Sequence, residues 1–180
     1  MTQHELRDRI GLVPQKGNLF SGTIRSNLKY GAPEATDEEL EEVIRIAQAK
    51  EFIDQKEEGL DTEISQGGTN VSGGQKQRLA IARAIAKNPD IYIFDDSFSA
   101  LDFKTDAKLR QELNQLVKKT QSTVLLVGQR IASIMDADQI IVLDEGQIVG
   151  KGTHDELMES CQVYQEIAYS QLSKEELSHE

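Results

Sequence analysis

The sequence predicts an α/β fold in which a parallel sheet is covered by helices on both faces. Short apolar segments at 10–13, 91–94 and 123–127 have the length of buried strands, and amphipathic helical patterns stand between them. Polar residues follow two of these strands: Asp95 and Asp96 come after the second, and Gln129 after the third. Ligands bind at the carboxyl ends of strands in such sheets, so we expect the functional site there.

Capping residues and apolar stripes predict the helices. Thr36 and Glu39 form a capping box before a helix whose apolar residues recur at helical spacing. Ser72 begins a second helix, which we expect to end at Asn88 and Pro89. The apolar stripe at 104–117 predicts a third helix.

Turn signals predict the remaining segments. Residues 59–74 are rich in glycine and polar side chains, which predicts a loop. Residues 144–146 separate two apolar segments as a hairpin turn does, and Thr153 with Glu156 forms a capping box before the last helix. We expect residues 171–180 to form an acidic tail.

The composition restricts the class of protein. A chain of 180 residues suits one domain, and its formal net charge of −11 argues against a nucleic-acid partner, which would need a basic surface. Cys161 is the only cysteine, so no internal disulfide forms. The longest apolar runs have four or five residues, far short of the roughly 20 of a membrane helix, and no signal peptide is visible. A membrane link would need a partner or chain outside these 180 residues.

The segment Ser72-Gly73-Gly74-Gln75 has the composition of a phosphate-binding helix start. Free backbone N–H groups at a helix start attract anions, and glycines let a phosphate approach the backbone without interference from a Cβ. Ser72 suits either the helix cap or a hydroxyl that donates to a γ-phosphate. Asp95 and Asp96, at the tip of the next strand, carry the oxygen ligands that Mg²⁺ prefers. Together these segments predict nucleotide chemistry.

The residues that follow extend both segments into the pattern of one family. Residues 72–84 resemble the signature motif of the ATP-binding cassette (ABC) ATPases, and residues 91–96 resemble the Walker B strand of the same family. The likeness extends over roughly residues 8–168, and residues 19–28 resemble the exporter version of this segment. It implies a P-loop NTPase-like (RecA-like) sheet flanked by helices, with an α-helical signature subdomain, that lacks the N-terminal P-loop portion.

The same resemblance implies a division of the chain. Residues 1–170 would form a truncated ABC nucleotide-binding domain, and 171–180 the acidic tail. Within the domain, about 1–30 would be the Q-loop region, 31–88 the helical subdomain with the signature, and 89–170 the core with the Walker B strand, the D-loop and the H-loop.

The resemblance also implies roles for single residues. Residues 72–75 would bind ATP held by a second cassette, so that two domains enclose two nucleotides. Gln15 matches the Q-loop glutamine, a Mg²⁺ ligand, and Asp95 matches the aspartate that holds Mg²⁺ through water. Asp102 ends the D-loop, which crosses the interface beside ATP. The implied cofactors are therefore ATP and Mg²⁺.

Three positions depart from the family pattern. Asp96 stands where the family carries the catalytic glutamate, Ser97 replaces the usual proline, and Gln129 replaces the switch histidine. Aspartate is one methylene shorter than glutamate, and glutamine cannot carry a proton. Departures at both catalytic positions, Asp96 and Gln129, resemble the slow, degenerate site of heterodimeric ABC exporters.

A P-loop requires the pattern Gly-x-x-x-x-Gly-Lys-Ser/Thr, and these 180 residues do not contain it. Gly150-Lys151 is followed by Gly152 and preceded by Glu145 at the place of the first glycine. We therefore expect the isolated 180 residues to expose apolar surface and unpaired strand edges, to bind ATP weakly, to hydrolyse it negligibly and to aggregate.

The leading hypothesis is an ATP-binding subunit fragment of an ABC exporter of the multidrug or lipid type, at the cytoplasmic face of the cell membrane. Its partners would be a second cassette, in a heterodimer, and a transmembrane domain in the same full-length chain. One alternative is a soluble ABC-type ATPase of DNA repair or translation. The other is a non-catalytic partial cassette that acts as an interaction module.

Overall fold

The computed structural model describes residues 2–176, and its internal contacts divide the chain into two units, Met1–Val127 and Gly128–Glu180. The division falls inside the range 89–170 that the sequence analysis treats as one core, and each unit is described by itself. None of the helices within residues 2–176 combines the length and the apolar character that a membrane crossing requires.

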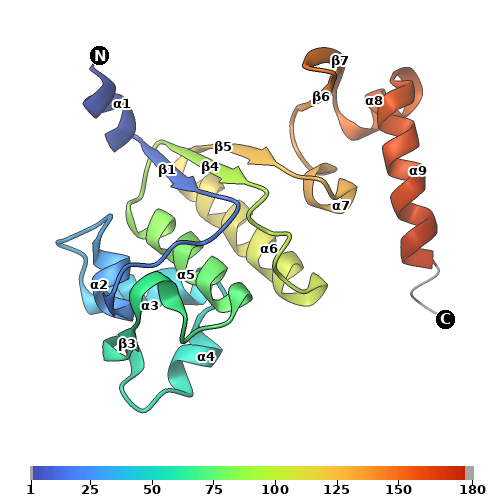
Figure 1. The fold of residues 1–180 in the computed structure, drawn as a ribbon. Helices are drawn as coiled ribbons and strands as arrows, with labels where there is room; N and C mark the ends of the chain where they lie inside the picture. The colour runs from blue at the N-terminus through green and yellow to red at the C-terminus, as the bar shows by residue number, and fades with distance from the viewer. Residues whose placement is uncertain (1, 177–180) are drawn as a thin grey trace. The chain divides into compact units, whose positions relative to one another are not determined.

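The first unit is built on a three-stranded parallel sheet in the order β1-β4-β5. A short helix, α1 (Gln3–Asp8), precedes β1 (Ile10–Val13), and the other strands are β4 (Ile91–Asp95) and β5 (Thr123–Val127). Helices α5 (Gly73–Ala86) and α6 (Phe103–Thr120) lie on the same side of this sheet (Figure 1). The predicted strands and the two predicted helices are thereby confirmed.

The two faces of this sheet differ in burial. On the helix side Val13, Tyr92 and Phe94 are fully buried and join the apolar residues of α5 and α6 in one core. On the other face Leu12, Leu125 and Val127 are 58%, 53% and 49% exposed. The prediction of a buried strand at 123–127 is therefore wrong, and the exposure agrees with the apolar surface expected on the isolated 180 residues. Among the described residues β5 pairs only with β4, which leaves it at the edge of the sheet.

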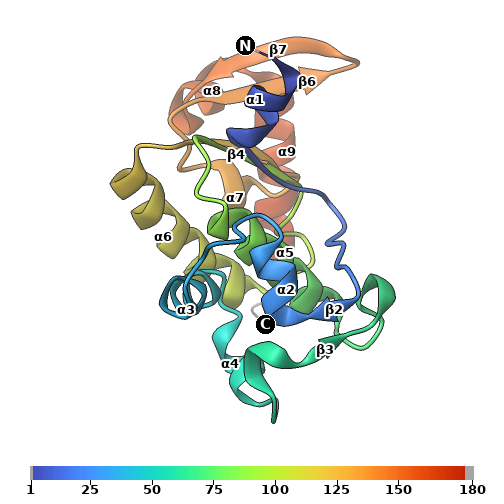
Figure 2. The same ribbon diagram turned by 90° about the vertical axis from the view of Figure 1, so that its left-hand side faces the viewer.

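A group of short elements lies on the side of α5 away from the sheet (Figure 2). The helices there are α2 (Ile24–Lys29), α3 (Asp37–Ile46) and α4 (Lys50–Asp54). The segment predicted as loop contains 3-10 turns at Gly59–Asp61 (η1) and Gln66–Gly68 (η2), and strand β3 (Glu63–Ile64), which pairs antiparallel with β2 (Gly22–Thr23). This pairing joins distant parts of the sequence, so local turn signals could not reveal it.

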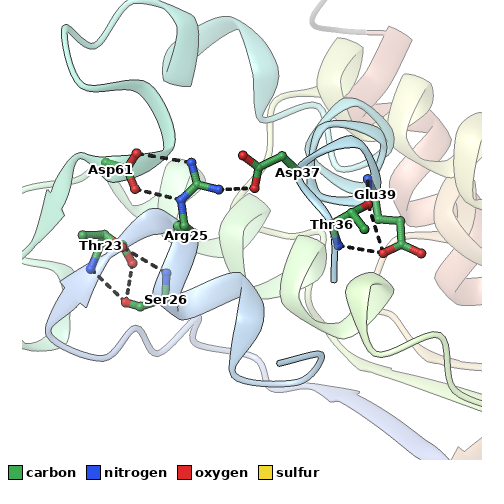
Figure 3. Close-up of polar contacts among 7 residues, drawn as sticks. All are labelled: Thr23, Arg25, Ser26, Thr36, Asp37, Glu39 and Asp61. Carbon is green, nitrogen blue, oxygen red and sulfur yellow. Dashed lines mark hydrogen bonds and ion pairs between the residues drawn. The ribbon is translucent and has the colours of Figure 1, made fainter. Parts of the chain in front are cut away.

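Polar contacts connect these short elements (Figure 3). Thr23 with Ser26 and Thr36 with Glu39 form the capping boxes of α2 and α3, the second as predicted. Arg25 lies between two carboxylates: its Nε donates to Asp61 over 2.8 Å, and its Nη1 donates to Asp37. The hydrogen bond that Arg25 donates to Asp61 raises the pKa of Arg25 and lowers that of Asp61. The guanidinium therefore stays charged and ties α2 to η1 and to α3.

The described part of the second unit, up to residue 176, contains a hairpin and three helices. Strands β6 (Ile140–Asp144) and β7 (Gln147–Gly152) pair antiparallel around a turn in which Glu145 and Gly146 have positive φ, which confirms the predicted hairpin. The helices are α7 (Ile131–Ile134), α8 (His154–Ser160), which begins at the predicted capping box, and α9 (Gln162–Glu176). Helix α9 extends into the predicted acidic tail, and residues 177–180 lie outside the described residues. A core of its own supports this unit, made by Ile140, Val142, Leu157, Cys161 and Tyr164.

Candidate functional site

The start of α5 is an exposed, self-capped helix end. The Ser72 hydroxyl accepts a hydrogen bond from the Gln75 N–H over 3.2 Å, and the Gln75 side chain accepts one from the Ser72 N–H over 3.0 Å. This capping box orients the end of the helix through contacts three residues apart. Ser72 and Gly73 are exposed. The helix start can therefore receive an anionic ligand from outside the chain.

The two glycines of this helix start differ in their surroundings. A Cβ built on Gly73 would meet no other atom within 4 Å, whereas one built on Gly74 would lie 3.4 Å from the Ala100 carbonyl oxygen. Neither glycine has a positive φ, so the fold itself does not demand glycine at position 73. Glycine there leaves open space in front of the helix start. The Gly74 contact also places this start beside the loop between β4 and α6.

That loop carries the predicted carboxylates. Asp95 ends β4 and is exposed, and Asp96 follows with φ 46°, a left-handed conformation that aspartate tolerates better than most side chains. The Asp96 N–H donates to the Val127 carbonyl oxygen over 2.9 Å, and its own carbonyl oxygen accepts from the Ser99 hydroxyl over 2.9 Å. The backbone of Asp96 is thus held on both sides, and this fixes where its carboxylate can reach.

The structure brings the predicted Q-loop glutamine to the second of these carboxylates. Gln15 is exposed, and its Nε2 donates to Asp96 Oδ2 over 3.2 Å. The side-chain oxygens of Gln15, Asp95 and Asp96 belong to one edge of the sheet, because β1 and β4 are parallel neighbours. Side-chain oxygens at one sheet edge are the donors that Mg²⁺ takes in proteins.

Asp102 has a structural function that the sequence analysis did not assign. Its carboxylate accepts a hydrogen bond from the Thr105 N–H over 2.9 Å and caps α6. The N–H bond lowers the pKa of Asp102, so the capping carboxylate is charged at neutral pH. The side chain is exposed and so can also meet a ligand.

Gln129 belongs to the second unit and is described with it. Its carbonyl oxygen accepts a hydrogen bond from the Gln171 side chain over 2.6 Å, and the same Gln171 side chain accepts one from the Ile131 N–H over 2.7 Å. Gln171 therefore ties the start of this unit to α9, and the Gln129 side chain is exposed.

Two residues beside the site were missed as functional candidates. Gln77 is 2% exposed and Ser97 is fully buried, and both bind the backbone of the segment that carries Gln15. The sequence feature that could have identified Gln77 is a polar side chain on the apolar face of a helix. The feature that could have identified Ser97 is the replacement of the proline of the family pattern.

Within residues 2–176, no three histidine, cysteine, aspartate or glutamate side chains gather as a protein-only metal site would need. Mg²⁺ commonly uses one or two protein oxygens together with water and nucleotide phosphates. The oxygens of Gln15 and Asp95 fit such a partial site, and a nucleotide would complete it.

Comparisons with known proteins identify the family of the chain. A model of the family described as ABC transporter matches residues 1–99. An uncharacterized ABC transporter ATP-binding protein of Mycobacterium tuberculosis is 51% identical over 165 residues, which are 90% of this chain and 28% of the relative. A putative multidrug export ATP-binding/permease protein of Staphylococcus aureus is 44% identical over 162 residues, with coverage of 90% and 28%.

A solved structure has the same fold. The bacterial Atm1-family ABC exporter with ATP bound superposes with a TM-score of 0.88 at 36% identity, over 93% of this chain and 29% of the exporter. The chain thus spans less than a third of the length of these relatives. The matched sequence and the α/β fold agree, and the chain belongs to the ABC transporter family.

Proposed function

We propose that this chain is part of the ATP-hydrolysing domain of an ABC exporter, and that its Ser72 helix start serves a nucleotide held by a second cassette. The observation that carries this proposal is the geometry of that start: an exposed, self-capped helix end with no Cβ in front of it. The N–H groups of Gly73 and Gly74 would bind the terminal phosphate of ATP, and the Ser72 hydroxyl would donate to it.

The chain's own carboxylates form the slower of two composite sites in this proposal. The Asp96 carboxylate is short, its backbone is fixed at Val127 and Ser99, and its Oδ2 is engaged by Gln15. A general base must lie within hydrogen-bond reach of the water that it activates. Gln129 can donate to a phosphate but cannot accept and release a proton as histidine does. Both features support slow hydrolysis at this site.

Mg²⁺, when bound with ATP, would supply charge neutralisation at the phosphates. Asp95, through water, and the Gln15 side-chain oxygen would hold it at the sheet edge. For that, Gln15 must turn its amide from Asp96, which its exposed position permits.

The partners are then a second cassette of different sequence and a transmembrane domain of the same full-length protein, with this chain at the cytoplasmic face of the membrane. The relatives named as export ATP-binding/permease proteins support the transmembrane partner, and the relative named for multidrug export supports a drug-like substrate.

The proposal is tested by turnover in the assembled exporter. Ser72→Phe fills the space before the helix start and should remove most of the ATP hydrolysis, by on the order of a hundredfold. Asp96→Asn removes the carboxylate of the slow site and should leave turnover within about twofold, since the partner's site provides most of it. The reverse pattern would show that the two sites are assigned the wrong way round.

A further inference from the structure

The segment 13–17, which carries Gln15 away from β1, is fastened by buried polar side chains from two other elements. Gln77, on α5, is 2% exposed, and its Oε1 accepts a hydrogen bond from the Gly17 N–H over 2.8 Å. The Nε2 of the same side chain donates to the Pro14 carbonyl oxygen over 3.2 Å. One amide therefore binds the backbone on both sides of Gln15.

Ser97, in the loop after β4, also holds the segment. Its side chain is fully buried, and its hydroxyl donates to the Val13 carbonyl oxygen over 2.8 Å. A proline at this position has no donor and would leave that bond unmade. The departure from the family pattern at Ser97 thus ties the loop with Asp96 to the segment with Gln15.

The fit around Gly17 is tight. A Cβ on Gly17 would lie 2.9 Å from the Lys76 carbonyl oxygen and 3.0 Å from Gln77 Oε1. Gly17 has no positive φ, so close approach to α5, and not backbone conformation, requires glycine. The segment is pressed against the helix that Ser72 begins.

We propose that Gln77 and Ser97 are positioning residues that set the location of Gln15 between the Ser72 helix and the Asp96 loop. Apolar packing alone would not need an amide and a hydroxyl that satisfy backbone groups of the same five-residue segment. Ser72 caps the helix that carries Gln77. A displacement of the helix start by a nucleotide would therefore also move the Gln77 anchor, and Gln15 with it. This consequence for ATP rests on the proposed function, but the positioning itself does not.

The first test is amide hydrogen exchange in the nucleotide-free assembled exporter. Gln77→Met keeps the length of the side chain and removes both hydrogen bonds, so the Gly17 amide should exchange roughly 5- to 30-fold faster. Exchange in α3 and α6 should stay unchanged. Gln111→Met makes the same chemical change at an exposed site on α6 and should not affect Gly17. Unchanged exchange at Gly17, or a uniform rise over the first unit, would overturn the proposal.

The second test separates positioning from folding. Mg²⁺ should raise ATP affinity at the site with Asp95 less in Gln77→Met than in the wild type, and Ser97→Ala should act in the same direction. In a Gln15→Ala background, Gln77→Met should change the Mg²⁺ effect no further, since both act through Gln15. An additive effect would refute this. If Gln77→Met does not fold, Ser97→Ala takes its place in the second test, because it removes the bond to the Val13 carbonyl oxygen.

These readouts distinguish the two proposals. Fast exchange at Gly17 in an exporter that hydrolyses no ATP would uphold the positioning and reject the function. If Ser72→Phe lowers ATP turnover as expected but Gln77→Met leaves exchange at the Gly17 amide unchanged, the function is upheld and the positioning is rejected.

Discussion

The start of α5 and the loop after β4 both carry predicted nucleotide-binding residues, but they are held in different ways. Ser72 and Gln75 hold each other through hydrogen bonds three residues apart. The loop is held by bonds from Gln15 to Asp96 and from Ser97 to Val13, which join positions 81 and 84 residues apart. The helix start is thus a local structure, whereas the loop depends on a distant segment.

Because of this difference, we expect the two regions to respond differently to substitution. At the helix start a change acts on the ligand or on one helix cap. In the loop, a change at Asp96 or Ser97 also acts on the position of the segment with Gln15. The expected effects below test this distinction, from the largest to the smallest.

The largest effect is expected from restoring the family residues in the loop and at the third strand end. In an exporter whose partner site is inactivated, Asp96→Glu with Gln129→His should raise residual ATP turnover by on the order of tenfold or more, because a longer base and a proton-carrying side chain return. Steady-state phosphate release measures this.

The single variants are the controls for that experiment. Asp96→Glu alone and Gln129→His alone should each give less than the pair, since the proposed function assigns both side chains to hydrolysis of the same nucleotide. If the double variant does not raise ATP turnover above the residual rate, catalysis at this site is limited by something other than these two departures.

Gly73→Ala should separate stability from activity at the helix start. The added Cβ meets nothing within the chain, so the helix loses no contact and gains from the better propensity of alanine, by between 0 and about 1 kcal/mol. The same Cβ stands in the space where a phosphate would approach, so turnover should fall by about tenfold or more. Thermal unfolding and an ATPase assay on the same sample measure both. A variant that loses stability and activity together would contradict a ligand role for Gly73.

The same contrast explains what the sequence could predict. The Ser72 cap, the helix after it and the strands at 10–13 and 91–95 follow from local spacing, and the structure has them. The exposure of Leu125 and Val127 depends on what covers that face of the sheet, which periodicity does not contain. The partners of Gln77 and Ser97 also lie far away in the sequence, so only coordinates reveal them.

The smallest effects are expected from the two helix caps, Ser72 on α5 and Asp102 on α6. Ser72→Ala removes a neutral cap and should cost about 1 kcal/mol of unfolding free energy at every pH. Asp102→Asn keeps a side-chain acceptor but removes the charge that favours the helix start. The Thr105 N–H lowers the pKa of Asp102 in the folded state, so its charge stabilises the protein above the ordinary aspartate pKa.

The pH dependence distinguishes these caps. The advantage of the wild type over Asp102→Asn should be complete at neutral pH and fall as the pH drops below about 4, through the lowered pKa, because the carboxylate is then protonated in both states. The difference between the wild type and Ser72→Ala should stay constant over the same range. Urea unfolding of the three proteins between neutral and acidic pH measures both. If the stability difference between the wild type and Asp102→Asn does not change with pH, the charge of Asp102 does not strengthen this cap. The cap of α6 would then act through its hydrogen bond alone, as the Ser72 cap of α5 does.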